Sequence, residues 1–356
     1  MQTTIDVTRT AAPKVKPDDR TLQFGEVFTD HMALMTYDKA HGWAGECIVP
    51  YGPLSLDPAA AVLHYAQAVF DGAKAFRGPG GAVRLFRPRK HIDRLQSSAA
   101  RLCMPAFDGD RVLEILRTLV DLDREWVPGA FGTALYIRPV IVATEAFLGV
   151  RPAAGYLLYI ILSPVGSYYA EGMSPVRILV TDRYVRAVTG GTGAAKTAGN
   201  YAASLLPGEE AHRAGFSQVL YLDGVHRRYI DEVGTMNFMV RIGDEVITPP
   251  LSGTILPGVT RDSALTILRD WGVSVSERPI TIDEVFEAAH AGRLVEAWGT
   301  GTAAVISPVG ELSYKGESIA INGGRTGELT QRLYDDITGI QYGTLPDRFG
   351  WMMPVE

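Results

Sequence analysis

GTGAAKTAGNYAASLLP, residues 191–207, surrounds Lys196 with small side chains and follows it closely with Asn200 and Tyr201. With Gly190 added, the stretch begins GGTGAAKT, one residue away from the phosphate-binding pattern G-x-x-x-x-G-K-[ST]. Small neighbours also let a bulky ligand approach and lower the dielectric around the amine, as a nucleophilic or Schiff-base lysine requires. The stretch alone leaves three interpretations open: a phosphate clamp, a covalently bonding lysine, and an exposed lysine in a glycine-rich loop.

The phosphate-clamp interpretation has one feature in its favour and three against it. Residues 219–223, VLYLD, resemble the apolar strand that ends in a magnesium-binding aspartate. However, Ala195 replaces the glycine before the lysine, and no strand-like run leads directly into Gly190. In addition, Gly199-Asn200 would interrupt the helix that should begin at the lysine and direct its dipole at the anion. We therefore expect no P-loop.

The chain has only seven lysines, so elimination is informative. Lys74 lies in the strand-like AKAFRG and remains a competitor of Lys196. The other five lie in the N-terminal segment, in a loop, near a helix start or in a turn, and each is most simply a surface charge: Lys14, Lys16, Lys39, Lys90 and Lys315.

Composition bounds the class of protein. Hydrophobic residues make up 46% and charged residues 21% of 356 residues, which is typical of a soluble globular protein of about two domains. The net charge of −6 gives no indication of nucleic acid or an anionic membrane as a partner, and no apolar run is long enough to cross a membrane. Cys47 and Cys103 lie far apart without partners at metal-ligand spacing. We therefore expect no metal, no disulfide scaffold and a cytoplasmic location.

The pattern of apolar residues predicts two domains. Helices are expected over 59–66, 88–102 and 111–126, and strands within 68–78, 133–145 and 155–165. After a Gly-, Ser- and Pro-containing connector, the pattern restarts with strands over 176–182, 218–223, 229–234 and 237–250, and helices over 261–272, 282–292 and 327–339. We expect a flexible arm (1–20), a smaller N-terminal α/β domain (21–165), an interdomain loop (166–176) and a larger C-terminal α+β domain (177–356).

The stretch around Lys196 is one of several motifs that belong together. With YIDEVGTMNFMV, LSGTILPGVTRDS and GTGTAAVISPV, it resembles the branched-chain amino-acid aminotransferases, pyridoxal-phosphate (PLP) enzymes of fold type IV and of the class IV aminotransferase family. The first half matches through FGEVFTDHM, LHYAQAVFDGAKAFRG, FRPRKHIDRL and LYIRPV, so the resemblance covers about residues 20–352. It implies an α+β fold, PLP as cofactor, a homodimer, and reversible ping-pong amino transfer between leucine, isoleucine or valine and 2-oxoglutarate.

The resemblance implies a role for each cofactor residue. Lys196 bonds PLP covalently and, once released, moves the proton between Cα and C4′. Glu232 keeps the pyridine nitrogen protonated, as an electron sink requires, and Tyr201 bonds the cofactor O3′. Without the resemblance, each of these residues has a simpler interpretation. Glu232 would be a solvated glutamate at a strand end beside Asp231, Tyr201 would be a core tyrosine, and Arg94 would be a surface charge. The implied phosphate contacts are Arg94, Thr302 and the helix-start amides of Val259 and Thr260.

The substrate must be held at its α-carboxylate and at a side chain that is either aliphatic or acidic. The resemblance implies that Arg138 takes the distal carboxylate of glutamate. Tyr136 and Arg138 are two residues apart in a strand-like run, so we expect them to face the same side. The other implied substrate residues are the aromatic walls Phe24, Tyr65, Tyr136 and Tyr168, and Thr235 and the Ala303 backbone for the α-carboxylate.

Several positions depart from the family pattern. Ala304 and Ser307 stand where some mammalian relatives carry a C-x-x-C pair, so thiol switching of that kind is absent. Trp298 is a bulky residue close to the expected site, and Asp71 stands where glutamate is common, from which we infer no functional change. The alternatives are another fold type IV enzyme (a D-amino-acid or (R)-amine transaminase, or aminodeoxychorismate lyase), a P-loop nucleotide-binding protein, and a catalytically idle binding protein.

Overall fold

The computed structural model describes residues 4–166 and 173–355 of the 356-residue chain. These residues divide into two compact units. The first unit contains 4–166, 195–198 and 339–355, and the second contains 173–194 and 199–338.

A nine-stranded sheet forms the centre of the first unit, in the order β1-β3-β2-β8-β7-β5-β6-β18 with β4 paired beside β7. The long strands β7 (Ala134–Ala143) and β8 (Gly155–Val165) pair antiparallel over the whole of β7. The other strands are β1 (Asp6–Val7), β2 (His31–Asp38), β3 (Gly42–Pro50), β4 (Ala68–Phe70), β5 (Ala73–Arg77), β6 (Val83–Phe86) and β18 (Met352–Pro354).

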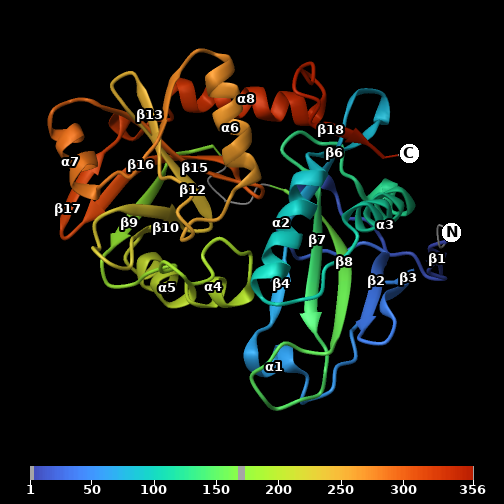
Figure 1. Cartoon of the computed structure of the whole chain (residues 1–356). Helices are drawn as coiled ribbons and strands as arrows, with labels where there is room; N and C mark the ends of the chain where they lie inside the picture. The colour runs from blue at the N-terminus through green and yellow to red at the C-terminus, as the bar shows by residue number, and fades with distance from the viewer. Residues whose placement is uncertain (1–3, 167–172, 356) are drawn as a thin grey trace. The chain divides into compact units, whose positions relative to one another are not determined.

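Two helices, α2 (Pro88–Arg101) and α3 (Gly109–Leu122), cover one face of this sheet (Figure 1). The helical periodicity predicted for α2 is confirmed, because Ile92, Leu95 and Ala99 all join the core beneath it. The short helix α1 (Ala61–Tyr65) directly precedes β4 in the chain and lies at one end of the sheet.

Alternation along β7 separates core residues from site residues. Leu135 and Ile137 join the core together with residues of α2 and α3. Because successive side chains of a strand point to opposite faces, Tyr136 and Arg138 lie on the other face of the sheet. The Arg138 Nη2 donates to Tyr136 Oη at 3.1 Å, so the predicted shared face is confirmed.

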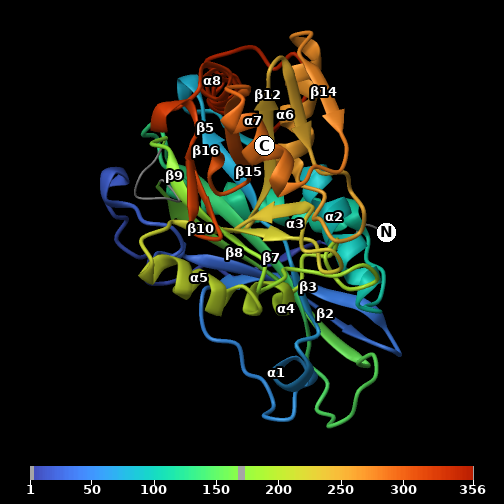
Figure 2. The same ribbon diagram turned by 90° about the vertical axis from the view of Figure 1, so that its left-hand side faces the viewer.

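A second nine-stranded sheet builds the second unit, in the order β11-β10-β9-β16-β15-β12-β13-β14 with β17 paired beside β16. Figure 2 shows α5 running beside β10, and α6 and α7 both contact β15. The strands are β9 (Val176–Thr181), β10 (Gln218–Leu222), β11 (Ile230–Val233), β12 (Met236–Ile242), β13 (Glu245–Thr248), β14 (Ser274–Glu277), β15 (Leu294–Gly301), β16 (Val305–Tyr314) and β17 (Glu317–Ala320). The helices are α5 (Leu205–Arg213), α6 (Val259–Asp270) and α7 (Ile282–His290).

Two helices bridge the boundaries of the units. They are α4 (Ala198–Ala202) and α8 (Glu328–Tyr342). The sequence predicts that Gly199-Asn200 interrupts a helix, but α4 runs through both residues. The Asn200 side chain stabilises this helix through two hydrogen bonds with Thr192, at 2.7 and 2.8 Å. With five residues, α4 is still far shorter than the helix a P-loop requires.

The division into units differs from the expected domain boundaries at two places. Residues 195–198 belong to the first unit because Thr197 bridges Val69 in β4. Residues 339–355 belong there because β18 pairs antiparallel with β6. In the described part of the chain, no helix has the length and apolar character needed to span a bilayer.

The N-terminal segment is predicted to be a flexible arm, but from residue 4 onward it is tied to the first sheet. β1 pairs parallel with β3. The Thr10 N–H donates to His31 Nε2 at 3.0 Å, and Lys14 Nζ donates to the carbonyls of Phe28 and Thr29. These contacts hold the segment along the edge of the sheet, so an arm free of the domain is not what the structure shows over these residues.

Candidate active site

The backbone of Lys196 is fixed between β4 and α2 in the first unit. Its N–H donates to Ser98 Oγ at 2.9 Å, and its carbonyl accepts from the Phe70 N–H at 3.0 Å. The neighbouring Thr197 hydroxyl donates to the Ala68 carbonyl at 2.7 Å. A lysine on a loose glycine-rich loop would have no such anchors, so two elements of the first unit hold the backbone of this lysine in place.

Two basic side chains lie near the Phe70 ring. Lys196 Nζ lies 5.1 Å from its centroid, and the Arg138 guanidinium carbon lies 4.8 Å from it. Cations are attracted to an aromatic face at this range. The ring therefore links the predicted cofactor-binding lysine to the predicted substrate-binding arginine, a role that no sequence pattern singled out.

Arg94 is buried, with 8% of its surface exposed, so the surface-charge interpretation is wrong. Its Nε and Nη2 each donate to Asp71 at 2.8 Å, and His91 Nδ1 donates to the same carboxylate at 2.7 Å. Burial alone would raise the pKa of the Asp71 carboxyl, but the Arg94 charge and the hydrogen bonds from Arg94 and His91 hold that pKa well below its ordinary value. Asp71 is therefore an anion at any pH of interest.

Part of the predicted substrate group is assembled in the first unit. The Phe24 ring meets the Tyr136 ring edge-on at 4.9 Å. A Cβ on Gly72 would lie 1.8 Å from Tyr136 Oη, so only glycine leaves room for that hydroxyl. Within the described residues, no Asp or Glu carboxylate forms an ion pair with Arg138, and its Nε is buried without a partner. This guanidinium is thus available for a ligand carboxylate.

The other two predicted aromatic walls are Tyr65 and Tyr168. Tyr65 is the last residue of α1, is 41% exposed, and its ring contacts that of His64 at 6.1 Å. Tyr168 lies outside the described residues.

Lys74, the competing lysine, is not a surface group. It lies on β5 opposite Tyr136 and is 7% exposed. Burial lowers the pKa of its amine to about 8. On burial alone, Lys74 still competes with Lys196.

In the second unit, Glu232 is buried at 2% exposure, so the solvated-glutamate interpretation is wrong. Its Oε1 accepts from the Leu256 N–H at 2.7 Å and from Asn237 Nδ2 at 3.0 Å. Its Oε2 pairs with Arg186 Nε at 2.7 Å. The neighbouring Asp231 differs, because burial raises its pKa to about 6. Of the two acids, Glu232 is the one held as a buried, paired carboxylate.

The predicted phosphate amides lie at the start of α6, close to Glu232. Val259 and Thr260 are its first two residues, and the N-cap Gly258 supplies no side-chain cap. A Cβ on Gly258 would lie 2.0 Å from Asn237 Oδ1, and Asn237 also bonds Glu232. An uncapped helix N-terminus suits a phosphate, and a nearby buried carboxylate suits a protonated pyridine nitrogen. The second unit therefore fits PLP at two of its polar groups.

The remaining predicted residues lie on turns and on α4 of the second unit. Thr235 is exposed in the β11–β12 turn, and Thr302 and Ala303 are half-buried in the β15–β16 turn. A Cβ on Gly301 would lie 3.9 Å from the Thr235 carbonyl, so the two turns are neighbours. The second turn ends at Val305, whose φ of 61° is a strained value for a β-branched residue.

Tyr201 and Trp298 differ in how deeply they are buried. Tyr201 is half-buried on α4. Trp298 is fully buried in β15.

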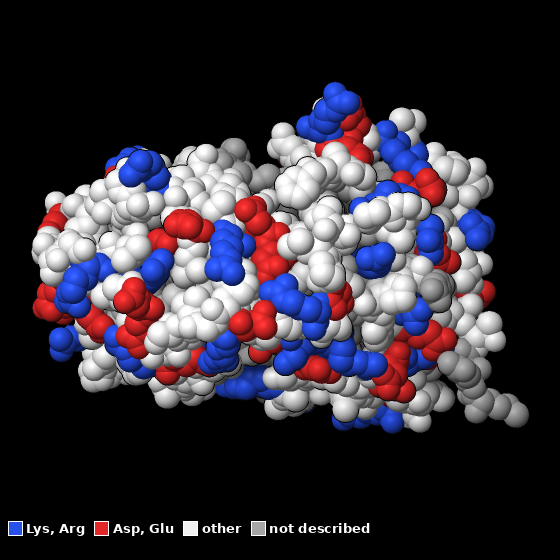
Figure 3. Space-filling view, turned by 90° about the horizontal axis from the view of Figure 1, so that it is seen from above, with Lys and Arg blue, Asp and Glu red and all other residues white. Residues whose placement is uncertain are grey.

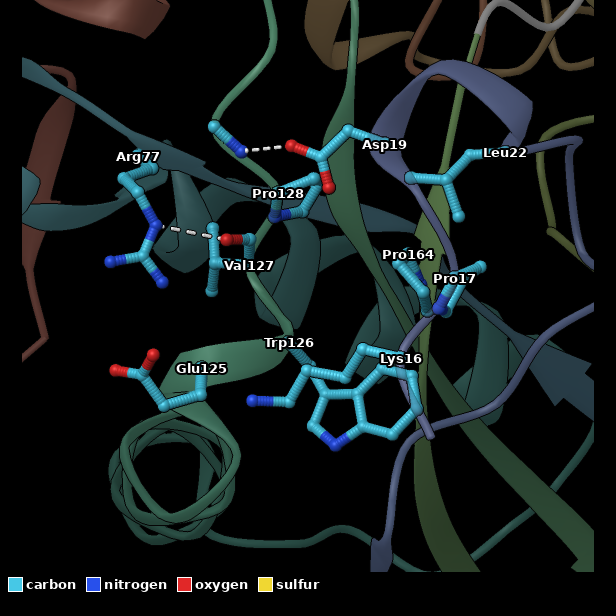
Figure 4. Close-up of a pocket in the computed structure, with 11 residues that line it drawn as sticks. Lys16, Pro17, Asp19, Leu22, Arg77, Glu125, Trp126, Val127, Pro128 and Pro164 are labelled. Atoms are coloured by element: carbon cyan, nitrogen blue, oxygen red, sulfur yellow. Dashed lines mark hydrogen bonds between the residues drawn. The ribbon is translucent and has the colours of Figure 1, made fainter. Parts of the chain in front are cut away.

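A separate cavity of about 320 Å³ lies in the first unit and contains none of the predicted site residues (Figure 4). Arg77 on its wall donates to the carbonyls of Val127 and Arg124 at 2.9 and 2.8 Å. These two bonds hold the backbone of the segment that follows α3. The lining residues are Lys16, Pro17, Asp19, Leu22, Arg77, Glu125, Trp126, Val127, Pro128, Gly129 and Pro164.

Comparison with known proteins assigns the family. The model of the amino-transferase class IV family matches residues 68–312, and the chain is 56% identical to "Branched-chain-amino-acid aminotransferase 2" of Bacillus subtilis over 99% of this chain and 97% of that protein. This chain belongs to the branched-chain-amino-acid aminotransferases of class IV. A probable member from Streptomyces coelicolor is 48% identical over 92% of this chain and 91% of its own length.

Solved structures of the family confirm the predicted α+β, fold type IV architecture. The Escherichia coli branched-chain amino acid aminotransferase superposes with a TM-score of 0.75 at 27% identity, covering 91% of this chain and 100% of that one. A branched-chain amino acid aminotransferase from T.th. with pyridoxamine 5′-phosphate gives 0.74 at 25% identity, covering 91% and 99%. Class IV aminotransferases depend on PLP, so the predicted cofactor is confirmed as well.

The sequence did not predict the residues that hold the predicted site residues in place through hydrogen bonds. Ser98 could have been found, because it follows Arg94 by one helical turn on α2. Arg186 and Asn237 carry no local signal, since their partners depend on how the second sheet folds. Asp71 stands out in the sequence as a departure from the family pattern, but its contacts with α2 are non-local and no pattern predicts them.

Proposed function

We propose that this protein is a PLP-dependent branched-chain-amino-acid transaminase, which transfers the amino group reversibly between leucine, isoleucine or valine and 2-oxoglutarate. The observation that carries the proposal is the 56% identity over nearly the whole chain to a branched-chain-amino-acid aminotransferase. The buried Glu232, the uncapped start of α6 and the anchored Lys196 support it, because each is a group that PLP chemistry needs.

Each cofactor residue has a proposed task. When bound, PLP supplies the electron sink that makes the Cα proton of the amino acid removable. Lys196 Nζ would hold the cofactor covalently and, once freed, would serve as the base that moves the substrate Cα proton. The Glu232 carboxylate keeps the pyridine nitrogen protonated, and Tyr201 bonds O3′. The phosphate contacts are Arg94, Thr302 and the amides of Val259 and Thr260.

The proposed substrate-binding residues must accommodate two kinds of substrate side chain, the aliphatic one of leucine and the acidic one of glutamate. Tyr136 and Phe24 offer apolar ring surface to a leucine side chain, and Arg138 offers a guanidinium to the distal carboxylate of glutamate. Thr235 and the Ala303 backbone bind the α-carboxylate that both substrates share. Tyr168 is proposed as a further wall.

We also propose that the protein is a cytoplasmic homodimer. Exposed apolar side chains gather on α1 and the adjoining β7–β8 loop, where Ala60 bridges Ala146: Leu63, Tyr65, Phe147, Leu148 and Val150. An exposed apolar patch is typical of a protein interface. Tyr65 at the end of α1 would then serve the site of the second copy. Leu148→Asp should lower the mass measured by light scattering to that of a monomer, and an unchanged dimer would contradict this interface.

No nucleic-acid partner is proposed. Basic and acidic side chains are interspersed on the face drawn in Figure 3.

The activity is tested by following glutamate formed from leucine and 2-oxoglutarate. Glutamate formation with the three branched-chain donors, and little with D-alanine or an (R)-amine, is expected. Pyruvate released from aminodeoxychorismate without a keto-acid acceptor would instead identify a lyase of the same fold. ATP binding with magnesium and no visible chromophore would identify a nucleotide-binding protein.

A further inference from the structure

We propose that Asp71 and His91 are positioning residues for the cofactor phosphate, which they serve by fixing the guanidinium of Arg94. The inference rests on the proposed function, in which Arg94 contacts the phosphate. Asp71 and His91 do not touch the cofactor in this proposal, so their effect reaches it only through Arg94.

The contact between Asp71 and Arg94 fixes a plane as well as a distance. Nε donates to Oδ2 and Nη2 donates to Oδ1, both at 2.8 Å, so one edge of the guanidinium is held by both carboxylate oxygens. A two-point pair of this kind removes rotation about the side chain and directs the Nη1 corner away from the carboxylate. Arg94 is thereby pre-oriented for a planar or tetrahedral anion before any ligand arrives.

His91 and the main chain fix the carboxylate in turn. Oδ1 of Asp71 also accepts from His91 Nδ1 and from the Gly72 N–H, both at 2.7 Å. With the two bonds from Arg94, the carboxylate accepts four hydrogen bonds, about its full capacity. Burial lowers the pKa of His91, so the ring donates from a neutral form and adds no charge to compete with Arg94. Asp71 is 0% exposed, so bulk solvent does not screen these contacts.

The same two elements hold Lys196. Phe70, the residue before Asp71, bonds the Lys196 carbonyl, and Ser98, one turn beyond Arg94 on α2, accepts from the Lys196 N–H. PLP carries its aldehyde and its phosphate on one pyridine ring, so the lysine and the arginine would have to lie within the span of one cofactor. The Asp71 network and the anchors of Lys196 hold both residues on the same two elements of one unit. The short aspartate side chain suits this network, because it places Oδ1 within hydrogen-bond distance of the Gly72 N–H.

The test compares PLP with pyridoxal, which lacks the phosphate. Apo-protein is titrated with each, and binding is followed by visible absorption. For Asp71→Asn we expect the dissociation constant of PLP to rise roughly 10- to 100-fold, as for loss of a charged hydrogen bond. The constant for pyridoxal should change less than about 3-fold. His91→Phe should act in the same direction more weakly, and His91→Asn, which keeps a donor near Nδ1, should restore most of the loss.

Two controls make the test specific. Asp93→Asn removes an exposed carboxylate from the same helix and should change neither constant. Arg94→Gln should show the same selective loss as Asp71→Asn, and the double variant should lose little more, because the two residues act as one unit.

Several outcomes would overturn the inference. These are an equal loss of PLP and pyridoxal, no loss for either Asp71→Asn or His91→Phe, or additive losses in the double variant. If Asp71→Asn does not fold, the two His91 variants decide. If the wild-type protein binds neither compound, the proposed function itself fails, and the inference with it.

Discussion

Replacing Lys74 with methionine should stabilise the protein near neutral pH. Lys74 is 7% exposed on β5, and burial lowers its pKa from the ordinary 10.5 to about 8. Below pH 8 the folded and unfolded states both carry the proton, so the folded state contains a buried ammonium, and the lowered pKa measures its net cost. A shift of one pKa unit corresponds to 1.36 kcal/mol, so that cost is about 3 kcal/mol.

The pH dependence has a definite sign. Between about pH 8 and pH 10.5 the unfolded chain binds a proton that folded Lys74 has released. Stability of the wild-type protein therefore rises with pH in this window, and the advantage of Lys74→Met should shrink from about 3 kcal/mol towards zero. Methionine has a similar length and no charge, so it fills the same space.

Urea unfolding of both proteins at pH 7 and pH 10 measures this difference. Lys39→Met, a change at an exposed lysine, is the matched control and should alter stability little at either pH. A Lys74→Met variant no more stable than wild type at pH 7, or an advantage that is the same at both values, would refute the desolvation of this amine.

Three more predictions concern the two carboxylates of β11 and the predicted substrate arginine. Arg138→Gln should raise KM for glutamate about 10- to 100-fold and leave KM for leucine nearly unchanged, measured in the two half-reactions; equal effects would remove the proposed role. Glu232→Gln should lower kcat on the order of 100-fold while PLP stays bound, and an unaltered kcat would argue against the pyridine contact. Asp231 has a pKa raised to about 6, so its ionisation costs stability as pH rises from about 4 to 6. Asp231→Asn should accordingly be more stable than wild type at pH 7 and not at pH 4, by urea unfolding.

Much of the fold follows from local patterns. The spacing of Ile92, Leu95 and Ala99 predicts α2, and alternation along β7 predicts the shared face of Tyr136 and Arg138. These signals are local because helix and strand periods come from the backbone itself. The pairing of β18 with β6 joins residues more than 250 positions apart, and nothing in either segment announces it.

The site was less predictable than the fold. Lys196 and Glu232 lie in segments typical of the family, but their partners Ser98 and Arg186 are set by tertiary packing. Asp71 shows the limit most clearly. In the sequence it is a departure without consequence, whereas in the structure it accepts four hydrogen bonds, three of them from α2. A single carboxylate gives no periodic signal, so its role appears only when the helix and the strand are brought together.

The covalent role of Lys196 is the central claim, and borohydride reduction tests it most directly. The purified protein with PLP should show a visible absorption band that borohydride abolishes, and peptide mapping should find the pyridoxyl group on Lys196. The Lys196→Ala variant should show neither the band nor the label. A pyridoxyl group on Lys74, or a protein that never acquires the band, would contradict the assignment of the site.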